Sequence, residues 1–145
     1  MSALFADTFY WIALTNVQDL AHEKVKAFSR AAKPNVIWTT EEVLTEYLNY
    51  FAGWGPRFRR KAALNIENML GNRTVRIVAQ TADSFRSGFN LYRERLDKGY
   101  SLTDCISMQA MRSEGITDAL TNDVHFEQEG FRAVLRGPQP ALSAE

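Results

Sequence analysis

The chain has 145 residues, of which 17 are basic and 17 are acidic, so its formal net charge is zero. This length suits one domain, and a hydrophobic fraction of 46% with 12% aromatic residues is enough for a sizeable core. The neutral balance excludes the overall basic character of many nucleic-acid-binding proteins, so any such binding has to come from local clusters.

Other features exclude further classes. The longest apolar run, 9–14, is far shorter than the about 20 residues that a membrane helix needs. The N-terminus has no basic segment followed by a signal-type apolar region, so we expect a cytoplasmic protein. Cys105 is the single cysteine, which excludes an intramolecular disulfide and fits a reducing compartment. With one cysteine and two histidines, a zinc site is not expected.

Short β-type runs alternate with helical stretches along the chain. The helices are predicted at 8–14, 20–32 (ended by Pro34), 39–52, 56–70, 81–98 and 101–113. The strands are predicted at 3–6, 35–38, 75–78, 119–121 and 131–135. Thr39 and Glu42 have the spacing of a capping box at the start of the third helix. The pattern predicts an α/β three-layer sandwich with a short, mainly parallel central sheet of four or five strands. We expect one domain over 1–136 and a flexible C-terminal tail over 137–145.

Several carboxylates stand where such a fold builds its active sites. Asp7 follows the first predicted strand and Asp123 follows the fourth. In parallel α/β folds, ligands bind outside the carboxyl ends of the strands, where the strand order reverses. Asp104 lies in the first turn of a predicted helix. Glu46 has apolar helical neighbours such as Val43, so we expect it to face inward.

Three of these residues also have a structural explanation. Asp7 suits the N-cap of the first helix, Asp104 suits a capping role after Ser101, and Asp123 suits a turn. Glu46, on an apolar face, needs a partner instead.

Taken together, the four acids indicate a metal site. Clustered carboxylates raise one another's pKa unless a cation lies among them. Oxygen ligands without cysteine or paired histidines select Mg²⁺ or Mn²⁺. Such an ion binds phosphate oxygens and activates water, which suits phosphodiester hydrolysis.

Four segments in order resemble a known family. They are Phe5-Ala-Asp-Thr8, Thr39-Thr-Glu-Glu-Val-Leu-Thr-Glu46, Ser101-Leu-Thr-Asp-Cys-Ile-Ser107 and Leu120-Thr-Asn-Asp-Val-His-Phe126 with Gly130-Phe131. Over residues 1–135 the chain resembles a PIN domain, specifically the VapC-type toxin ribonucleases of bacterial and archaeal toxin–antitoxin pairs. The resemblance implies catalytic metal ligands at Asp7, Glu46, Asp104 and Asp123, with supporting polar side chains at Thr8, Thr121 and Asn122. The chain departs from the family at Phe9, where relatives usually have Asn or Ser.

The resemblance also implies a biological role. A protein of this kind is a Mg²⁺- or Mn²⁺-dependent endoribonuclease, forms a homodimer, and is inhibited by a cognate antitoxin whose Arg reaches the acidic site. No direct DNA binding and no membrane attachment are expected. The flanking phosphates of the RNA are assigned to Arg57, Arg59, Arg60 and Lys61, although a solvated helix face explains this cluster equally well. His125 is interpreted as stabilising the turn after the fourth strand.

Three other functions fit the sequence less well. A phosphoacceptor domain needs an Asp directly after the strand at 75–78, and Asp83 comes too late. A nucleotide-binding domain needs a glycine-rich phosphate loop after a strand, and the sequence has none. A degenerate PIN module without catalysis is disfavoured because all four acids are present.

Overall fold

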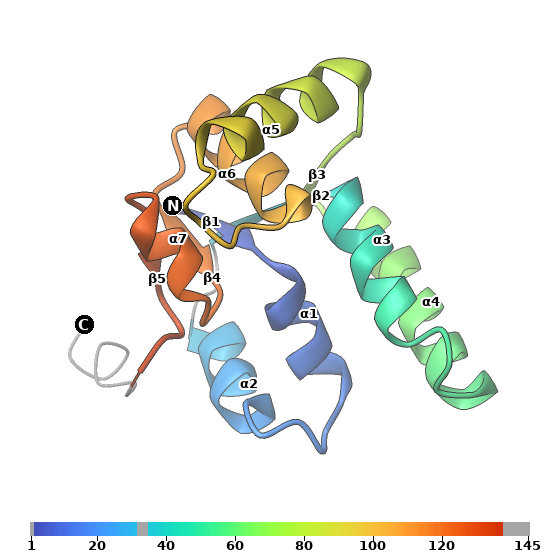
Figure 1. Cartoon of the computed structure of the whole chain (residues 1–145). Coiled ribbons are helices and arrows are strands. Elements are labelled where there is room, and N and C mark those ends of the chain that lie inside the picture. Colours follow the sequence, from blue (N-terminus) through green and yellow to red (C-terminus); the bar gives the residue numbers. More distant parts are fainter. Residues whose placement is uncertain (1, 32–34, 138–145) are drawn as a thin grey trace.

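Five parallel strands form the centre of the protein. The structure is a computed structural model, and it describes residues 2–31 and 35–137 (Figure 1). The sheet has the order β3-β2-β1-β4-β5, and every pairing is parallel, which confirms the predicted fold class. The strands are β1 (Ala3–Ala6), β2 (Val36–Thr40), β3 (Val75–Val78), β4 (Asp118–Leu120) and β5 (Arg132–Ala133). The order reverses between β1 and β4, because β2 and β3 extend the sheet to one side and β4 and β5 to the other.

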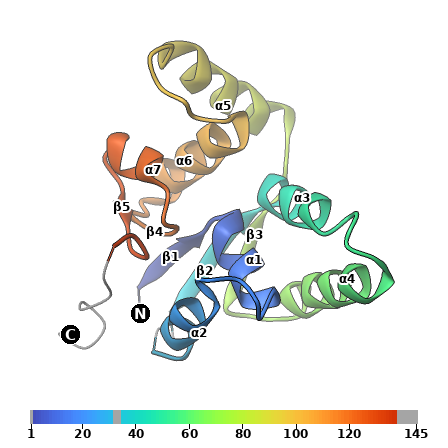
Figure 2. The same ribbon diagram turned by 60° about the horizontal axis from the view of Figure 1, so that its bottom comes forward.

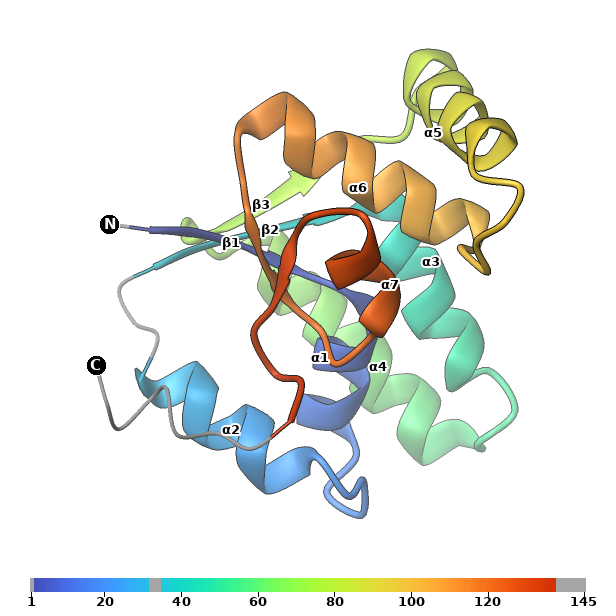
Figure 3. The same ribbon diagram turned by 60° about the vertical axis from the view of Figure 1, so that its left-hand side comes forward.

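Helices cover both faces of this sheet. They are α1 (Thr8–Thr15), α2 (His22–Ala31), α3 (Glu41–Tyr50), α4 (Pro56–Leu70), α5 (Ala82–Glu94), α6 (Leu102–Glu114) and α7 (Val124–Gln128). Figures 2 and 3 show α5 and α6 on one side of the sheet and α1, α2 and α4 on the other. The α3 helix contacts α1, α4 and α6, so it connects the two helical layers.

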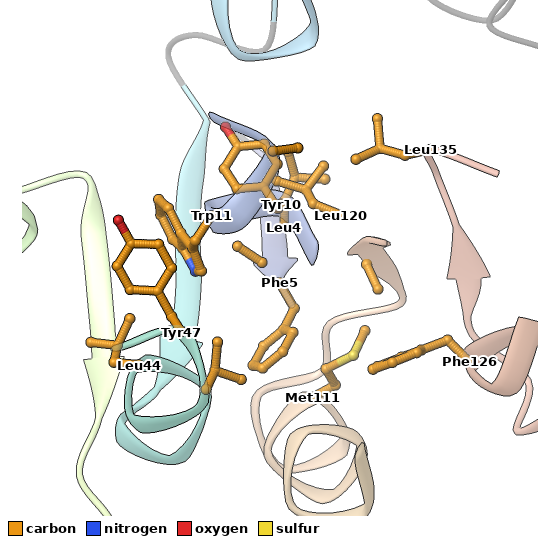
Figure 4. Close-up of a cluster of buried hydrophobic side chains, with 14 of the residues drawn as sticks. Leu4, Phe5, Tyr10, Trp11, Leu44, Tyr47, Met111, Leu120, Phe126 and Leu135 are labelled. Atoms are coloured by element: carbon orange, nitrogen blue, oxygen red, sulfur yellow. The ribbon is translucent and has the colours of Figure 1, made fainter. Parts of the chain in front are cut away.

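The core is built on the alternation of side chains along β1. Successive residues of a strand point to opposite faces of a sheet. Leu4 therefore lies with Tyr10 on one side, whereas Phe5 points toward Met111 of α6 on the other (Figure 4). Ala6 is also fully buried at the end of the strand, just before the chain turns into α1.

The predicted capping box of α3 with Thr39 as N-cap is wrong, because the helix begins one residue later than expected. Thr40 is the N-cap, and its hydroxyl accepts a hydrogen bond from the Val43 backbone N–H at 3.1 Å. Thr39 belongs to β2, because the pairing of β2 with β3 continues through Thr40. The buried Thr39 hydroxyl instead donates to the Ala6 carbonyl at 2.9 Å, which ties β2 to the end of β1.

The helix predicted at 81–98 is also shorter than expected, because α5 ends at Glu94. It packs closely against α6 at Gly88, where an added Cβ would lie 2.3 Å from the Ile106 side chain and 3.1 Å from its backbone. Glycine is therefore required there for the two helices to approach each other.

Two predictions lie outside the described residues. Pro34, the predicted end of the second helix, is one, and the predicted tail, apart from Gly137, is the other. No helix within residues 2–31 and 35–137 is long and apolar enough to cross a membrane.

Candidate active site

The site lies where β1 and β4 run side by side. Ala6 pairs with Leu120, so the residues that follow the two strands leave the sheet at the same edge. The Asp7 backbone N–H donates to the Leu120 carbonyl at 3.4 Å. Asp7 and Asp123 therefore come together at the point where the strand order reverses, as their positions after two predicted strands implied.

All four predicted acids line one open pocket of about 630 Å³ at this edge. They belong to four separate segments: the β1–α1 junction, α3, the first turn of α6 and the start of α7. The remaining lining residues are Thr8, Phe9, Ile12, Asn49, Tyr50 and Ser101. The fold thus collects residues that are more than a hundred positions apart in the sequence, since Asp7 and Asp123 belong to the same cavity wall.

Asp7 is the most buried of the four, with 7% of its surface exposed. It occupies the N-cap position of α1, but its side chain makes no capping hydrogen bond, so the structural explanation does not account for it. Burial, followed by repulsion from Asp104, raises its pKa to about 7, although hydrogen bonds from the Thr8 backbone and the Thr121 hydroxyl lower it. This carboxyl group is destabilised as an anion in the protein alone.

Thr121 connects two of the acids. Its fully buried hydroxyl donates to Asp7 Oδ2 at 3.0 Å and accepts from the Asp123 backbone N–H at 3.1 Å. One side chain therefore fixes both the orientation of Asp7 and the path of the chain at Asp123. Thr8 has a comparable contact, because its hydroxyl donates a short hydrogen bond to Glu46 Oε1.

Asp104 and Asp123 combine a capping role with a place in the pocket. Asp104 completes a capping box with Ser101, in which Asp104 Oδ2 accepts from the Ser101 N–H at 3.1 Å. Asp123 is the N-cap of α7 and its Oδ1 accepts from the His125 N–H at 2.9 Å. Burial raises the pKa of Asp104, and repulsion from Asp123 adds to the shift, while the Ser101 N–H and His125 lower it. Structural and chemical explanations are thus not exclusive here.

The prediction that Glu46 faces inward is wrong. Glu46 is exposed at the rim of the pocket, and the buried face of α3 is formed by Val43, Leu44 and Tyr47. Helical spacing alone placed Glu46 beside Val43, but the residue lies at the margin of the apolar stripe rather than within it. Its partner is the Thr8 hydroxyl.

His125 lies closer to the acids than its predicted role in the turn implied. Its backbone does stabilise the turn through Asp123, but its imidazole also lies against the acids. Nδ1 is 3.3 Å from Asp123 Oδ1 and 3.6 Å from Asp104 Oδ2. Ligand atoms of Asp104, Asp123 and His125 all lie within 4.8 Å of one another. The signal in the sequence was its position two residues after Asp123, which places it in the first turn of the helix that starts beside the same pocket.

Comparison with known proteins agrees with this geometry. The chain is 30% identical over 128 residues to the 23S rRNA-specific endonuclease VapC20 of Mycobacterium tuberculosis, covering 88% of this chain and 95% of that protein. The crystal structure of VapC20, described as a sarcin–ricin loop cleaving toxin, superposes with a TM-score of 0.80 over 90% of this chain and 98% of that one. This chain belongs to the VapC family of PIN-domain toxin endoribonucleases.

A more distant VapC structure shares the fold. VapBC2 from Rickettsia felis, solved with a DNA fragment from its promoter, matches with a TM-score of 0.61 at 19% identity, over 87% of this chain and 92% of that one. No protein-family model matches the sequence.

Several predicted residues stay outside this VapC pocket. Asn122 is exposed and does not line the cavity. The basic cluster Arg57, Arg59, Arg60 and Lys61 is exposed on the first half of α4 and does not line it either. The Arg59 guanidinium donates to the Ala52 carbonyl at 3.0 Å, which anchors it at the α3–α4 turn.

The donors in the VapC pocket fit a divalent ion. In the described part of the chain, no arginine or lysine lines the cavity, so no permanently charged side chain of the protein balances the four carboxylates. The buried Nδ1 of His125 also has no hydrogen-bond partner among the described residues, although it faces two carboxylates. Carboxylate oxygens are the ligands that Mg²⁺ and Mn²⁺ prefer. Asp7, Asp104, Asp123 and Glu46 are the residues available to hold such an ion.

Proposed function

We propose that this VapC-family protein hydrolyses RNA phosphodiester bonds with Mg²⁺ or Mn²⁺ held by Asp7, Asp104, Asp123 and Glu46. The observation that supports this most directly is the convergence of four carboxylates in one pocket that no described lysine or arginine lines. A protein gains nothing in stability by raising the pKa of Asp7 to about 7, so the arrangement is explained by an ion that joins the protein.

A divalent ion held by these residues would neutralise charge at the scissile phosphate and acidify a water molecule. Hydrogen bonds within the protein hold the acidic side chains in place. Thr121 holds Asp7 in one orientation, and the capping bonds of Asp104 and Asp123 fix their carboxylates on two helix starts. Glu46 is oriented by the Thr8 hydroxyl at the exposed rim of the pocket.

A groove beside the pocket extends the proposal to the substrate. A second cavity of about 630 Å³ shares Glu46 and Asn49 with the acidic pocket, and its largely polar lining includes the apolar side chains of Phe85, Leu102 and Ile106. Unpaired bases of loop RNA stack on such aromatic and apolar surfaces. We propose a structured RNA loop as the substrate class, and because the relative VapC20 cleaves the sarcin–ricin loop, the same loop of 23S rRNA is the first substrate to test.

The predicted partners and compartment form part of the same proposal. We expect a cognate antitoxin whose Arg enters the acidic pocket, because a guanidinium matches paired carboxylates in charge and in geometry. A homodimer and a cytoplasmic location are expected from the family. Light scattering of the purified protein, alone and with its antitoxin, measures the stoichiometry.

Cleavage of ribosomal RNA tests the function. Purified protein is incubated with isolated ribosomes, a sarcin–ricin loop oligonucleotide and a mixed RNA pool, each with Mg²⁺, Mn²⁺ or EDTA. We expect metal-dependent cleavage that EDTA stops and that Asp123→Asn abolishes.

Asp118→Asn is the matched control. Asp118 is the first residue of β4, the strand that precedes Asp123, and its carboxylate lies 3.7 Å from the Arg132 guanidinium. Cleavage that survives EDTA or Asp123→Asn contradicts the proposal. Cleavage of the pool but not of the loop corrects the substrate while retaining the enzyme class.

A further inference from the structure

The imidazole of His125 is held in a defined orientation beside the acids. Its ring centroid lies 5.4 Å from that of the buried Tyr100, with an angle of 59° between the rings. Nε2 faces the chain at Gly99, where an added Cβ would lie 3.4 Å from that atom. The other ring nitrogen, Nδ1, is therefore directed toward Asp104 and Asp123.

Nδ1 lacks a hydrogen-bond partner in spite of this position. The atom is buried and makes no hydrogen bond with any described residue. Its nearest acidic atoms, at 3.3 Å and 3.6 Å, are carboxylate oxygens, which carry lone pairs. A buried polar atom without a hydrogen-bond partner costs free energy, and so does the repulsion between two neighbouring carboxylates. A cation among the three atoms removes both penalties.

The distances agree with one shared ion. Ligand atoms that lie about 2.1 Å from one ion are about 3.0 Å apart when adjacent and about 4.2 Å apart when opposite. The separations of 3.3 Å and 3.6 Å from Nδ1 fall between these limits. All three ligand atoms lie within 4.8 Å of one another, which needs only a small adjustment to enclose an ion.

We infer that His125 is a direct nitrogen ligand, through Nδ1, of the divalent ion held by Asp104 and Asp123. This inference rests on the proposed metal-dependent function and specifies one ligand of the site. Imidazole favours Mn²⁺ and the later transition metals over Mg²⁺, whereas a site of oxygen ligands alone discriminates little. The protein therefore prefers Mn²⁺ to Mg²⁺, and His125 is the residue that produces the preference.

Pulsed electron paramagnetic resonance of the Mn²⁺-loaded protein tests the inference without any assay of activity. Wild-type protein is prepared with natural-abundance histidine and with ¹⁵N-histidine. We expect a ¹⁴N hyperfine modulation on Mn²⁺ in the first sample and a ¹⁵N pattern in the second. Because this comparison needs no substitution, it stands even where a variant folds poorly.

The variant His125→Gln shows which histidine gives the nitrogen signal. The variant retains His22, which is buried and whose Nδ1 lies 2.7 Å from the Ala13 carbonyl, so any signal from that residue remains. We expect the histidine pattern to disappear and Mn²⁺ affinity to fall by about tenfold, the scale of losses around metal ligands, with a smaller fall for Mg²⁺.

The outcomes separate the two proposals. Mn²⁺ bound at the carboxylates without a histidine nitrogen pattern overturns the inference and leaves the metal-dependent function standing, with His125 as an imidazolium paired to the acids. Absence of Mn²⁺ binding overturns both. A histidine-coordinated ion in a protein that cleaves no RNA supports the inference and contradicts the function.

Discussion

The carboxylates at the two ends of α7 have opposite electrostatic surroundings. At the C-terminal end, Glu129 receives the Arg95 guanidinium at 2.9 Å and 2.8 Å, Arg112 at 2.6 Å and the Tyr100 hydroxyl at 2.9 Å. Burial alone raises the pKa of Glu129, but the hydrogen bonds from Arg95, Arg112 and Tyr100 outweigh it and hold the pKa at about 2.

At the N-terminal end, no arginine of the described chain pairs with the carboxylates as Arg95 and Arg112 pair with Glu129. Asp123 is the N-cap of α7 and lines the same pocket as Asp7, whose pKa is raised by burial to about 7. No arginine or lysine of the described chain lines that pocket. The same chain therefore neutralises a carboxylate where it serves the structure, and leaves carboxylates uncompensated where an outside cation is expected.

The largest predicted effect is the loss of catalysis in Asp7→Asn. We expect RNA cleavage to fall by at least about a hundredfold, because the variant removes a charge that the metal and the scissile phosphate require. Rates of cleavage under single-turnover conditions measure it. Activity within a few-fold of wild type would show that the uncompensated charge has no chemical role.

Glu129→Gln tests the opposite end of α7. Two guanidinium groups would lose their shared anion, so we expect the free energy of unfolding to fall by about 3 kcal/mol. Since the pKa of Glu129 lies below that of an unfolded glutamate, its contribution is present above pH 4.5 and is lost as the pH falls toward about 2.

Chemical denaturation at several pH values measures this effect, with Glu127→Gln as the matched control. Glu127 is a close neighbour that pairs with Arg136 at 2.8 Å while both remain exposed, so its removal should cost less than about 1 kcal/mol. Equal effects of the two substitutions would remove the contrast between the ends of α7.

Asp7→Asn should also stabilise the metal-free protein, by roughly 2 kcal/mol at pH 7. An unfolded Asp7 loses its proton near pH 3.8, whereas the folded protein retains it to about pH 7. Between these values the folded state binds more protons, so wild-type stability declines as the pH rises, and the variant lacks this decline. Thermal unfolding in EDTA measures it. A variant that is less stable than wild type across this range would contradict the claim that the Asp7 carboxylate destabilises the metal-free protein.

The smallest expected effect concerns the basic cluster on α4. Arg57→Ala with Arg60→Ala should weaken RNA binding several-fold and make the salt dependence of log K shallower by about 0.7 for each phosphate that the protein no longer neutralises. Fluorescence anisotropy at several salt concentrations measures it, with the exposed Arg73→Ala as control. An unchanged salt slope would show that this cluster is a solvated helix face.

The fold and much of the pocket followed from the sequence because local signals marked strand ends and helix starts. Asp7 after β1, Asp104 in a capping box and Asp123 after β4 each stand at a boundary that residue type alone indicates. Parallel strands then place such boundaries at one edge of a sheet.

Features set by tertiary contacts were not predictable in the same way. The capping threonine of α3 moved to Thr40 because pairing with β3 extended β2. Glu46 lay at the edge of an apolar stripe, where helical spacing does not decide between burial and exposure. The Glu129 network joins α6, the end of α7 and the segment just after α5, and no spacing in the sequence signals it.

Calorimetric titration of the metal-free protein with Mn²⁺ at pH 7 tests most directly whether an outside cation completes the acidic end of α7. We predict saturable binding in the wild type, release of protons from the pocket as the ion enters, and loss of binding in a variant combining Asp104→Asn with Asp123→Asn. Absence of saturable binding in the wild type, or binding that persists unchanged in that variant, would contradict the account.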